Sequence, residues 1–207
     1  MWQAGTSRMD RQHGFHPFQM TERLATADAP PPVPYPNCYW VIPEKLLAGE
    51  YPGDVDETTT KARLLALLQS GIRTFIDLTE EGEIYGAKAL GYAGLLKTVA
   101  DEDRVEITGM RVPIPDRSIP SVWTMRRILD VMDRSIADDN AVFIHCWAGR
   151  GRTGTAIGCY LRRHNLVSGP EVVRKLAELR RWMPIGHESS PHTPEQIRMV
   201  RNWKDGA

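Results

Sequence analysis

The sequence predicts an α/β fold in which a central, mostly parallel sheet is flanked by helices. Short apolar runs alternate with longer amphipathic stretches along the chain, and this alternation is typical of such a sheet. One apolar run leads into a glycine-rich segment that opens a helix, which places an anion-binding loop between a strand and a helix. A length of 207 residues suits one domain of this class with a tail.

The predicted tail covers residues 1–36 and differs in composition from the rest of the chain. It ends in a proline-rich run over residues 29–36 that is typical of a polyproline-type connector, and no sustained periodicity precedes this run. We therefore expect residues 1–36 to form a flexible tail and residues 37–207 to form the folded domain.

In the first part of the domain, two short apolar runs predict strands over residues 38–42 and 45–49, with a turn at Pro43 between them. Residues 56–69 are predicted to form a helix, because apolar side chains recur on one side and a glycine follows its end. Residues 72–78 are mostly apolar, so we expect a buried strand there.

The middle of the chain has a weaker pattern over residues 80–106, where we expect loop and one short helix around residues 95–100. A further strand is predicted over residues 107–114. Residues 122–137 are predicted to form a helix that begins after Ser121, because serine is a favoured N-terminal cap.

The last third of the chain predicts one more strand and three helices. Residues 141–144 form a short apolar run typical of a buried strand, and the next helix is expected over residues 155–164. Helices are also predicted over residues 170–182 and 194–203, since each begins with a proline, which fits the first turn of a helix.

The segment between the strand of residues 141–144 and the helix after it carries the chemistry. Its glycines permit the dihedral angles with which several backbone N–H groups can face an anion, and the helix dipole lies behind them. A thiol at Cys146 would place a nucleophile below a bound phosphate, and Arg152 would clamp the phosphate from the side. The segment reads His145-Cys146-Trp147-Ala148-Gly149-Arg150-Gly151-Arg152-Thr153-Gly154, and the predicted phosphate-binding residues are Trp147, Ala148, Gly149, Arg150, Gly151 and Arg152.

The other two cysteines have a simpler interpretation. A free cysteine is usually a small, inert core residue, and we favour this alternative for Cys38 and Cys159 but not for Cys146. Three cysteines in a chain of this length do not suggest a disulfide framework.

The order His-Cys, five residues, Arg, then Ser or Thr resembles the signature of the cysteine-dependent protein phosphatases. Residues 149–154 also resemble the Gly-x-Gly-Arg-Thr-Gly of the tyrosine and dual-specificity branches. The resemblance covers roughly residues 37–203, and the short domain is similar to compact dual-specificity enzymes, to bacterial members and to the kinase-associated phosphatase. It implies hydrolysis of phosphate monoesters in two steps through a phosphocysteine, with no metal and no other cofactor.

The same resemblance implies roles for three more residues. Asp116 lies 30 residues before Cys146 in a loop stiffened by three prolines, and it resembles the family's general acid, an Asp followed four residues later by Pro. A solvated surface Asp is the alternative. His145 would order the loop and favour the thiolate, unless it is simply a hydrogen-bonded core residue. Thr153 would donate its hydroxyl to the sulfur as the intermediate breaks down.

A second motif, over residues 189–196, resembles the water-positioning loop of this superfamily, Gln-Thr-x-x-Gln. Thr193 and Gln196 match this pattern, and His192 replaces the first Gln. Either His192 takes the role of that Gln or Gln196 carries the role alone. The alternative is a well-capped helix start, with Thr193 as the cap and a proline in the first turn.

Composition limits the partners. The charge is balanced, with 26 basic and 26 acidic residues, so nothing in it argues for nucleic acid. No apolar run is long enough to span a bilayer, and residues 1–20 lack the apolar core of a signal peptide, so we expect a cytoplasmic protein. The sequence leaves the oligomeric state open.

The expected substrate is a phosphorylated protein or peptide, with phosphotyrosine first and phosphoserine and phosphothreonine as further candidates. The alternative is an inositol phosphate or a phosphoinositide, because Arg150 adds a second base to the loop, unless it pairs with a local acid. The lowest-ranked alternative is a non-catalytic phosphate-binding module. Tyr85, Lys88 and Tyr92 lie where substrate-contacting loops fall in the family, but the spacing assigns them no role.

Overall fold

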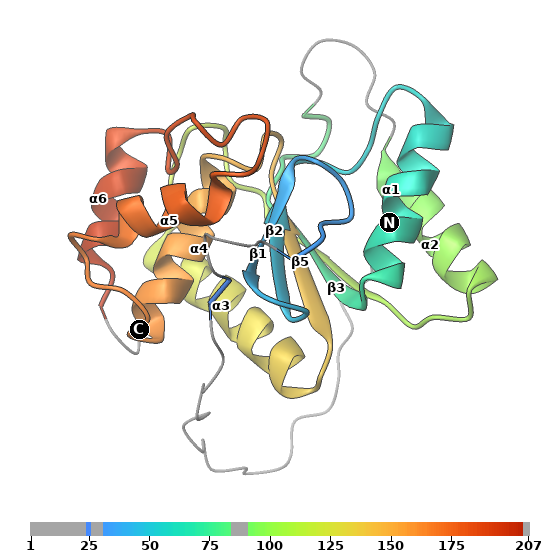
Figure 1. Ribbon diagram of the computed structural model, residues 1–207, viewed down its shortest axis with the longest axis horizontal. Helices are drawn as coiled ribbons and strands as arrows, with labels where there is room; N and C mark the ends of the chain where they lie inside the picture. The colour runs from blue at the N-terminus through green and yellow to red at the C-terminus, as the bar shows by residue number, and fades with distance from the viewer. Residues whose placement is uncertain (1–23, 26–30, 84–90, 205–207) are drawn as a thin grey trace.

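The computed structural model describes residues 24–25, 31–83 and 91–204, and a five-stranded sheet forms its centre (Figure 1). The strand order is β1-β2-β5-β3-β4. Strand β1 is antiparallel to β2, while the other three pairs are parallel, which confirms the predicted mostly parallel sheet. The strands are β1 (Cys38–Ile42), β2 (Leu46–Gly49), β3 (Ile72–Asp77), β4 (Thr108–Arg111) and β5 (Ala141–His145).

Helices cover both faces of this sheet. In Figure 1, α1 and α2 pack together on one side, and α3 to α6 form the layer on the other side. The helices are α1 (Glu57–Gln69), α2 (Tyr92–Glu102), α3 (Val122–Ala137), α4 (Arg152–Arg163), α5 (Val172–Arg180) and α6 (Pro194–Asn202). Within the described ranges, no helix combines the length and the apolar character that crossing a membrane requires.

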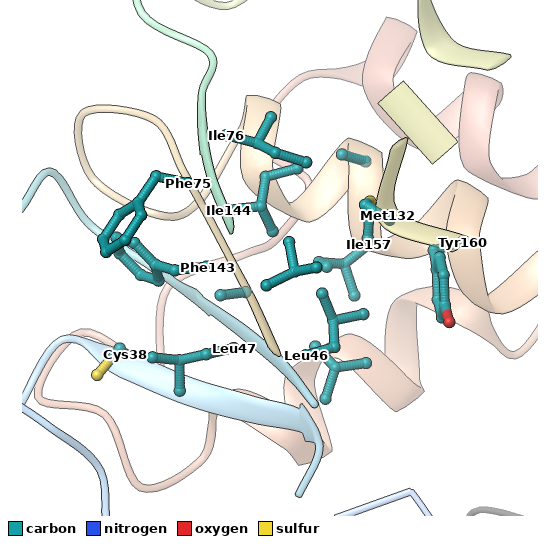
Figure 2. Packing of buried hydrophobic residues seen from close by; sticks show 14 of the residues in the cluster. Cys38, Leu46, Leu47, Phe75, Ile76, Met132, Phe143, Ile144, Ile157 and Tyr160 are labelled. Carbon is teal, nitrogen blue, oxygen red and sulfur yellow. The ribbon is translucent and has the colours of Figure 1, made fainter. Parts of the chain in front are cut away.

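The central strand β5 shows why this sequence forms a sheet that is buried on both faces. All five of its residues are buried, and successive side chains point to opposite faces. Phe143 and Phe75 lie together on one face, with ring centroids 6.2 Å apart, while Ile144 and Ile76 point to the other face, toward Ile157 of α4 (Figure 2). A continuous apolar run therefore serves both layers of helices.

The parallel strands place the functional loops at one edge. The chain leaves β2, β3, β4 and β5 at the same edge, because these four strands run in one direction. In open α/β sheets, ligands bind outside these carboxyl ends of the strands. The glycine-rich segment follows β5 at this edge.

Several predicted boundaries were wrong. The helix predicted over residues 170–182 covers only Val172–Arg180, so Pro170 lies before the helix and not in its first turn. The short helix expected around residues 95–100 extends over Tyr92–Glu102, because its buried side chains recur at helical spacing from Tyr92 to Ala100. Helix α4 begins at Arg152 and not at Thr155. The strand predicted over residues 107–114 ends at Arg111, because prolines at positions 113 and 115 have no N–H to donate to a ladder.

The described part of the predicted tail contacts the domain. The Tyr35 hydroxyl donates to the carbonyl of Glu50 at 2.7 Å, and the Trp40 indole N–H donates to the carbonyl of Pro32 at 3.0 Å. Residues 1–23 and 26–30 lie outside the described residues, so the flexibility of the tail and the boundary at residue 36 stay predictions.

Candidate active site

The glycine-rich loop leaves β5 and enters α4, as the sequence predicts. Cys146 follows the last residue of β5 directly and is 2% exposed. Gly149 has a φ of +63°, and a Cβ at this position would lie 2.5 Å from the carbonyl oxygen of Gly49 and 2.7 Å from the nitrogen of Glu50. Only glycine fits both the dihedral angle and this close approach to the end of β2.

A pocket of about 260 Å³ opens above Cys146. The residues that line it come from the glycine-rich loop, from the loop after β4 and from the loop before α6. They are Asp116, Arg117, Cys146, Trp147, Ala148, Arg150, Gly151, Arg152 and His192. A larger hollow of about 560 Å³ lies beside α2 and β4, but none of the predicted site residues lines it.

Arg152 is buried at the wall of this pocket and is held by fixed partners. Its two terminal nitrogens donate to the two carboxylate oxygens of Glu83, at 2.6 and 2.5 Å, and one of them also donates to the carbonyl of Ile114 at 2.9 Å. Burial alone lowers the pKa of Arg152, but the Glu83 hydrogen bonds and the nearby negative groups raise it further than burial lowers it. The guanidinium therefore keeps its charge inside the protein.

Glu83 was missed by sequence reasoning. It belongs to the acidic stretch Glu80-Glu81-Gly82-Glu83, in which nothing distinguishes one carboxylate from another. Only the fold brings Glu83 to Arg152, 69 positions further along the chain.

Asp116 reaches the pocket from the loop after β4. Its Oδ1 lies 3.4 Å from an Arg152 nitrogen, and its side chain is 41% exposed. Two hydrogen bonds tie this acid loop to the start of α6: Thr193 Oγ1 donates to the carbonyl of Arg117 at 3.4 Å, and Gln196 Nε2 donates to the carbonyl of Ser118 at 3.0 Å. A partly exposed carboxylate on a tethered loop can exchange protons with solvent and still face the pocket.

His145 lies below the loop, fully buried, and its contacts define its tautomer. Nδ1 is 3.2 Å from the carbonyl oxygen of Cys146, which can only accept, so Nδ1 carries the proton. Nε2 then accepts from the Tyr92 hydroxyl at 2.7 Å. Burial lowers the pKa of His145, against the nearby charge of Asp77, and keeps the ring neutral.

Asp77 supports this arrangement from the end of β3. Arg111 Nε donates to Asp77 Oδ2 at 2.9 Å, and the Thr79 hydroxyl donates to Oδ1 at 2.6 Å. Burial opposes the ionisation of Asp77, but the electropositive Nδ1–H side of His145, 4.0 Å from Oδ1, the Thr79 hydrogen bonds and the Arg111 charge together hold its pKa below the usual range. No pattern in the sequence indicates Asp77, Thr79 or Arg111, because the fold brings them together from the ends of β3 and β4.

Tyr51 supports the loop from the side. Its backbone N–H donates to the carbonyl of Trp147 at 2.9 Å, and the two rings stack with centroids 5.5 Å apart. Its ring also meets Tyr92 edge to face, at a centroid distance of 5.2 Å. Tyr51 therefore connects the start of the loop to the tyrosine that binds His145.

Thr153 has an unused hydrogen-bonding group. Its hydroxyl oxygen is buried, and within the described part of the chain it has no hydrogen-bond partner. Thr153 is the second residue of α4, on the helix that begins where the glycine-rich loop ends. A free donor at this place fits the predicted role toward the sulfur.

The residues of the second motif, 189–196, have different surroundings in the structure. Gln196 is buried and does not line the pocket: its Oε1 accepts from the backbone N–H groups of His192 and Thr193, at 3.0 and 3.1 Å. His192 lines the pocket itself, and burial followed by the charges of Arg150 and Arg117 lowers the pKa of its imidazole. The position that departs from the expected Gln-Thr-x-x-Gln pattern is thus the one that lines the pocket.

Arg150 lines the pocket but is already paired. Its Nη1 forms an ion pair with Glu188 at 2.5 Å, and its Nε donates to the carbonyl of Ser189 at 2.8 Å. This is the local pairing that the sequence left open. Tyr85 and Lys88 lie outside the described residues, whereas Tyr92 is buried beneath the loop.

The fold and this pocket point to the cysteine-dependent class of phosphatases, because Cys146, Arg152 and Asp116 meet around one glycine-rich loop. A family model described as "Polymorphic toxin system, DSP-PTPase phosphatase" matches residues 51–165, which is more than half of the chain. The chain therefore belongs to the dual-specificity family of cysteine-dependent phosphatases.

The relatives that the chain resembles include dual specificity phosphatases. The chain is 29% identical over 200 residues to the dual specificity protein phosphatase CDC14AB of Danio rerio, covering 89% of this chain and 27% of the relative. It spans between 27% and 32% of the length of the CDC14 phosphatases that it matches over most of its own length.

The solved structures support the fold. The active form of Tk-PTP superposes with a TM-score of 0.57 and 21% identity, covering 77% of this chain and 91% of that one. The kinase associated phosphatase superposes with a TM-score of 0.56 and 17% identity, covering 75% of this chain and 83% of that one.

Proposed function

We propose that this chain hydrolyses phosphate monoesters through a covalent phosphocysteine. The observation that supports this most strongly is the meeting of Cys146, Arg152 and Asp116 at one pocket, because Asp116 reaches it from the loop after β4, apart from the segment that carries Cys146 and Arg152. A non-catalytic binding module would need the anion loop but not a carboxylate acid beside it.

In the first step, the Cys146 thiolate attacks phosphorus in line, and the bond from phosphorus to the ester oxygen breaks. The loop N–H groups and Arg152 hold the other phosphate oxygens as charge moves onto the leaving oxygen. Asp116 protonates that oxygen, so the alcohol or phenol leaves neutral. Glu83 fixes the plane of the Arg152 guanidinium during this step.

In the second step, water attacks the phosphocysteine and the bond between phosphorus and sulfur breaks. Asp116, now a carboxylate, accepts a proton from the water, and the Thr153 hydroxyl donates to the departing sulfur. His192 faces the pocket as a neutral imidazole and orients the water. Gln196 acts as a positioning residue, because it joins the His192 backbone to the acid loop at Ser118.

Phosphotyrosine in proteins is the proposed substrate, with phosphoserine and phosphothreonine as further substrates. The inositol-phosphate alternative depends on a free charge at Arg150, and the ion pair with Glu188 neutralises that charge. We place the enzyme in the cytoplasm, where reducing conditions preserve a catalytic thiolate.

Phosphate release in EDTA tests the proposal, with phosphotyrosine, phosphoserine and phosphothreonine peptides and a set of inositol polyphosphates as substrates. We expect release from phosphotyrosine that Cys146→Ser abolishes. Asp116→Asn should lower kcat by about 10²-fold or more on peptides, whereas Asp138→Asn, at an exposed acid outside the pocket, should not change kcat. Turnover that survives Cys146→Ser would disprove the mechanism, and release from polyol phosphates alone would replace the substrate class.

A further inference from the structure

Three large apolar side chains are exposed in one short segment just after the acid loop. Ile119, Val122 and Trp123 are 42%, 55% and 69% exposed. Other exposed large apolar residues stand on separate elements, such as Val55 before α1 and Trp182 after α5. Single exposed apolar residues are ordinary, but a group of three that includes a tryptophan is typical of a binding surface. We call Ile119, Val122 and Trp123 the acid-loop patch.

The acid-loop patch lies at the edge of the sheet that holds the pocket. Helix α3 connects β4 to β5, and both of these strands are parallel to β3. The helix must therefore begin near the end of β4 and return to the start of β5, which puts its N-terminus at the edge where Cys146 lies. Arg117, two residues before Ile119, lines the pocket itself, so the patch continues from the rim of the pocket.

This surface is also positively charged. Residues 117–129 contain three arginines, Arg117, Arg126 and Arg127, and no acidic residue. All three are exposed, and none forms an ion pair with an acid in the ranges that the structure describes. The Arg127 guanidinium lies 5.9 Å from the centre of the Trp123 ring. Arg150, on the other side of the pocket, is by contrast neutralised by Glu188.

We propose that the acid-loop patch and these arginines bind the peptide chain beside the phosphorylated residue and select apolar and acidic neighbours. An apolar side chain of the substrate would contact Val122 and Trp123, and acidic side chains would pair with Arg126 and Arg127. Tryptophan and arginine are the side chains that most often dominate binding surfaces. This inference rests on the proposed function, since it names the substrate class of the same site.

A peptide is the favoured ligand of the acid-loop patch, because the patch begins where the rim of the pocket ends. The pocket takes one phosphorylated group, and an extended chain advances about 3.4 Å per residue, so side chains a few positions away reach a surface that starts at the rim. A small sugar phosphate has no group that extends to Trp123. An anionic membrane is the remaining alternative, and the test includes it.

The test compares two phosphotyrosine peptides that differ only in their flanks, one with leucine and glutamate and one with alanine and lysine. We expect the wild-type enzyme to prefer the first peptide by at least about tenfold in kcat/KM. Trp123→Ala should remove most of this preference by raising KM with kcat unchanged, which is the signature of lost uniform binding. Exchange of Arg126 and Arg127 for Glu should reverse the preference for acidic flanks.

Trp182→Ala is the matched control, because Trp182 is 57% exposed, also lies near an arginine and does not line the pocket. It should leave the preference intact. Turnover of p-nitrophenyl phosphate, which has no flanking chain, should be unchanged by Trp123→Ala. Equal kcat/KM for the two peptides, or the same loss in both tryptophan variants, would overturn the proposal.

Two further measurements keep the two proposals distinguishable. If p-nitrophenyl phosphate is not hydrolysed, the proposed function fails, and calorimetric binding of the two peptides to Cys146→Ser still tests the patch on its own. Phosphatidylserine vesicles are the membrane probe: vesicle binding that needs Trp123, together with no peptide preference, would assign the patch to a membrane and reject the peptide proposal.

Discussion

The guanidinium of Arg152 is fixed by the protein from two sides, by the carboxylate of Glu83 and by the carbonyl of Ile114. A buried arginine with a free choice of rotamers would have to be ordered each time a phosphate binds, at the cost of its conformational entropy. The pair with Glu83 removes most of this cost in advance. It also keeps a positive charge in a buried place where it would otherwise be costly.

Glu83→Gln removes the charge of this carboxylate and keeps its size. We expect kcat/KM for phosphotyrosine peptides to fall about 10- to 100-fold, because the guanidinium loses its fixed orientation beside the phosphate. Steady-state kinetics at neutral pH measures this effect. Glu81→Gln, in the same loop but exposed, is the control and should behave like the wild-type enzyme. Equal activity in both variants would show that Glu83 does not position Arg152.

At this scale, the sequence predicted the residues of the local motif but not their supporting partners. Cys146, Arg152 and Thr153 lie in one short segment of the chain, so a local pattern with a chemical meaning predicts them. Glu83 and Tyr92 reach the site from 69 and 53 positions away, and no local pattern distinguishes either one. Their contacts exist only after the sheet has brought the ends of separate strands together.

Among the elements, the glycine-rich loop depends on β2 as much as on β5 and α4. The backbone at Gly149 packs directly on the backbone at Gly49 and Glu50, where β2 ends. Tyr51, two residues after β2, holds the other end of the loop through the carbonyl of Trp147. The end of β2 therefore acts as a rigid support for the anion-binding loop.

Gly149→Ala would put a methyl group into this contact at a positive φ. We expect kcat/KM to fall at least about 100-fold, because the loop must move away from β2 and carry its N–H groups with it. Gly71→Ala is the control: Gly71 also has a positive φ, of +85°, but a Cβ there meets nothing within 4 Å. This variant should lose about 1 kcal/mol in urea denaturation and keep its activity. Similar losses of activity in both variants would show that the contact with β2 is unimportant.

The periodicity of apolar residues predicted that each helix and strand exists. It did not predict where each one ends, because the ends depend on contacts with other parts of the chain. The strand after residue 107 keeps buried side chains at Val112 and Ile114, so its apolar pattern continues beyond the ladder that ends at Arg111. The predicted length of helix α2 was too short, because its local sequence signal is weaker than the helix itself. Its N-cap is Gly91 and Gly94 lies in its first turn, and these glycines weaken a local helix signal that burial of Tyr92 and Leu96 restores.

At the scale of the whole molecule, two buried residues of the sheet contribute both to the site and to the free energy of unfolding. His145 and Asp77 lie at the ends of the adjacent strands β5 and β3, in register with each other, beneath the phosphate loop. Both are buried titratable groups. The free energy of unfolding must therefore depend on pH through residues that also support the site.

The direction of this dependence follows from the two pKa values. Burial lowers the pKa of His145 in the folded state, so the unfolded chain binds a proton near pH 6.5 that the folded chain does not. The pKa of Asp77 is also lowered, and its stabilising contribution is present above about pH 4 and is lost as the pH falls further. Stability should therefore decrease on acidification, first below about pH 6.5 and again below about pH 4.

Urea denaturation at several pH values between 5 and 8 tests the His145 part. The wild-type free energy of unfolding should fall toward acid pH with a slope of up to about 1.4 kcal/mol per pH unit from this group. His145→Gln should be less stable at pH 8 but have a smaller slope. His187→Gln, at an exposed histidine, should keep the wild-type slope. An unchanged slope in His145→Gln would contradict the argument.

The three cysteines of this chain occupy very different surroundings, which has a practical consequence for labelling. Burial raises the pKa of Cys38 to about 12 and raises that of Cys159 as well, so both remain unreactive thiols in the folded protein. Cys38 lines a separate hollow of about 240 Å³, whereas Cys146 lines the pocket of about 260 Å³ that we propose receives the phosphate. An anionic alkylating reagent such as iodoacetate should thus behave as an affinity reagent, attach once per native chain, and be blocked by inorganic phosphate.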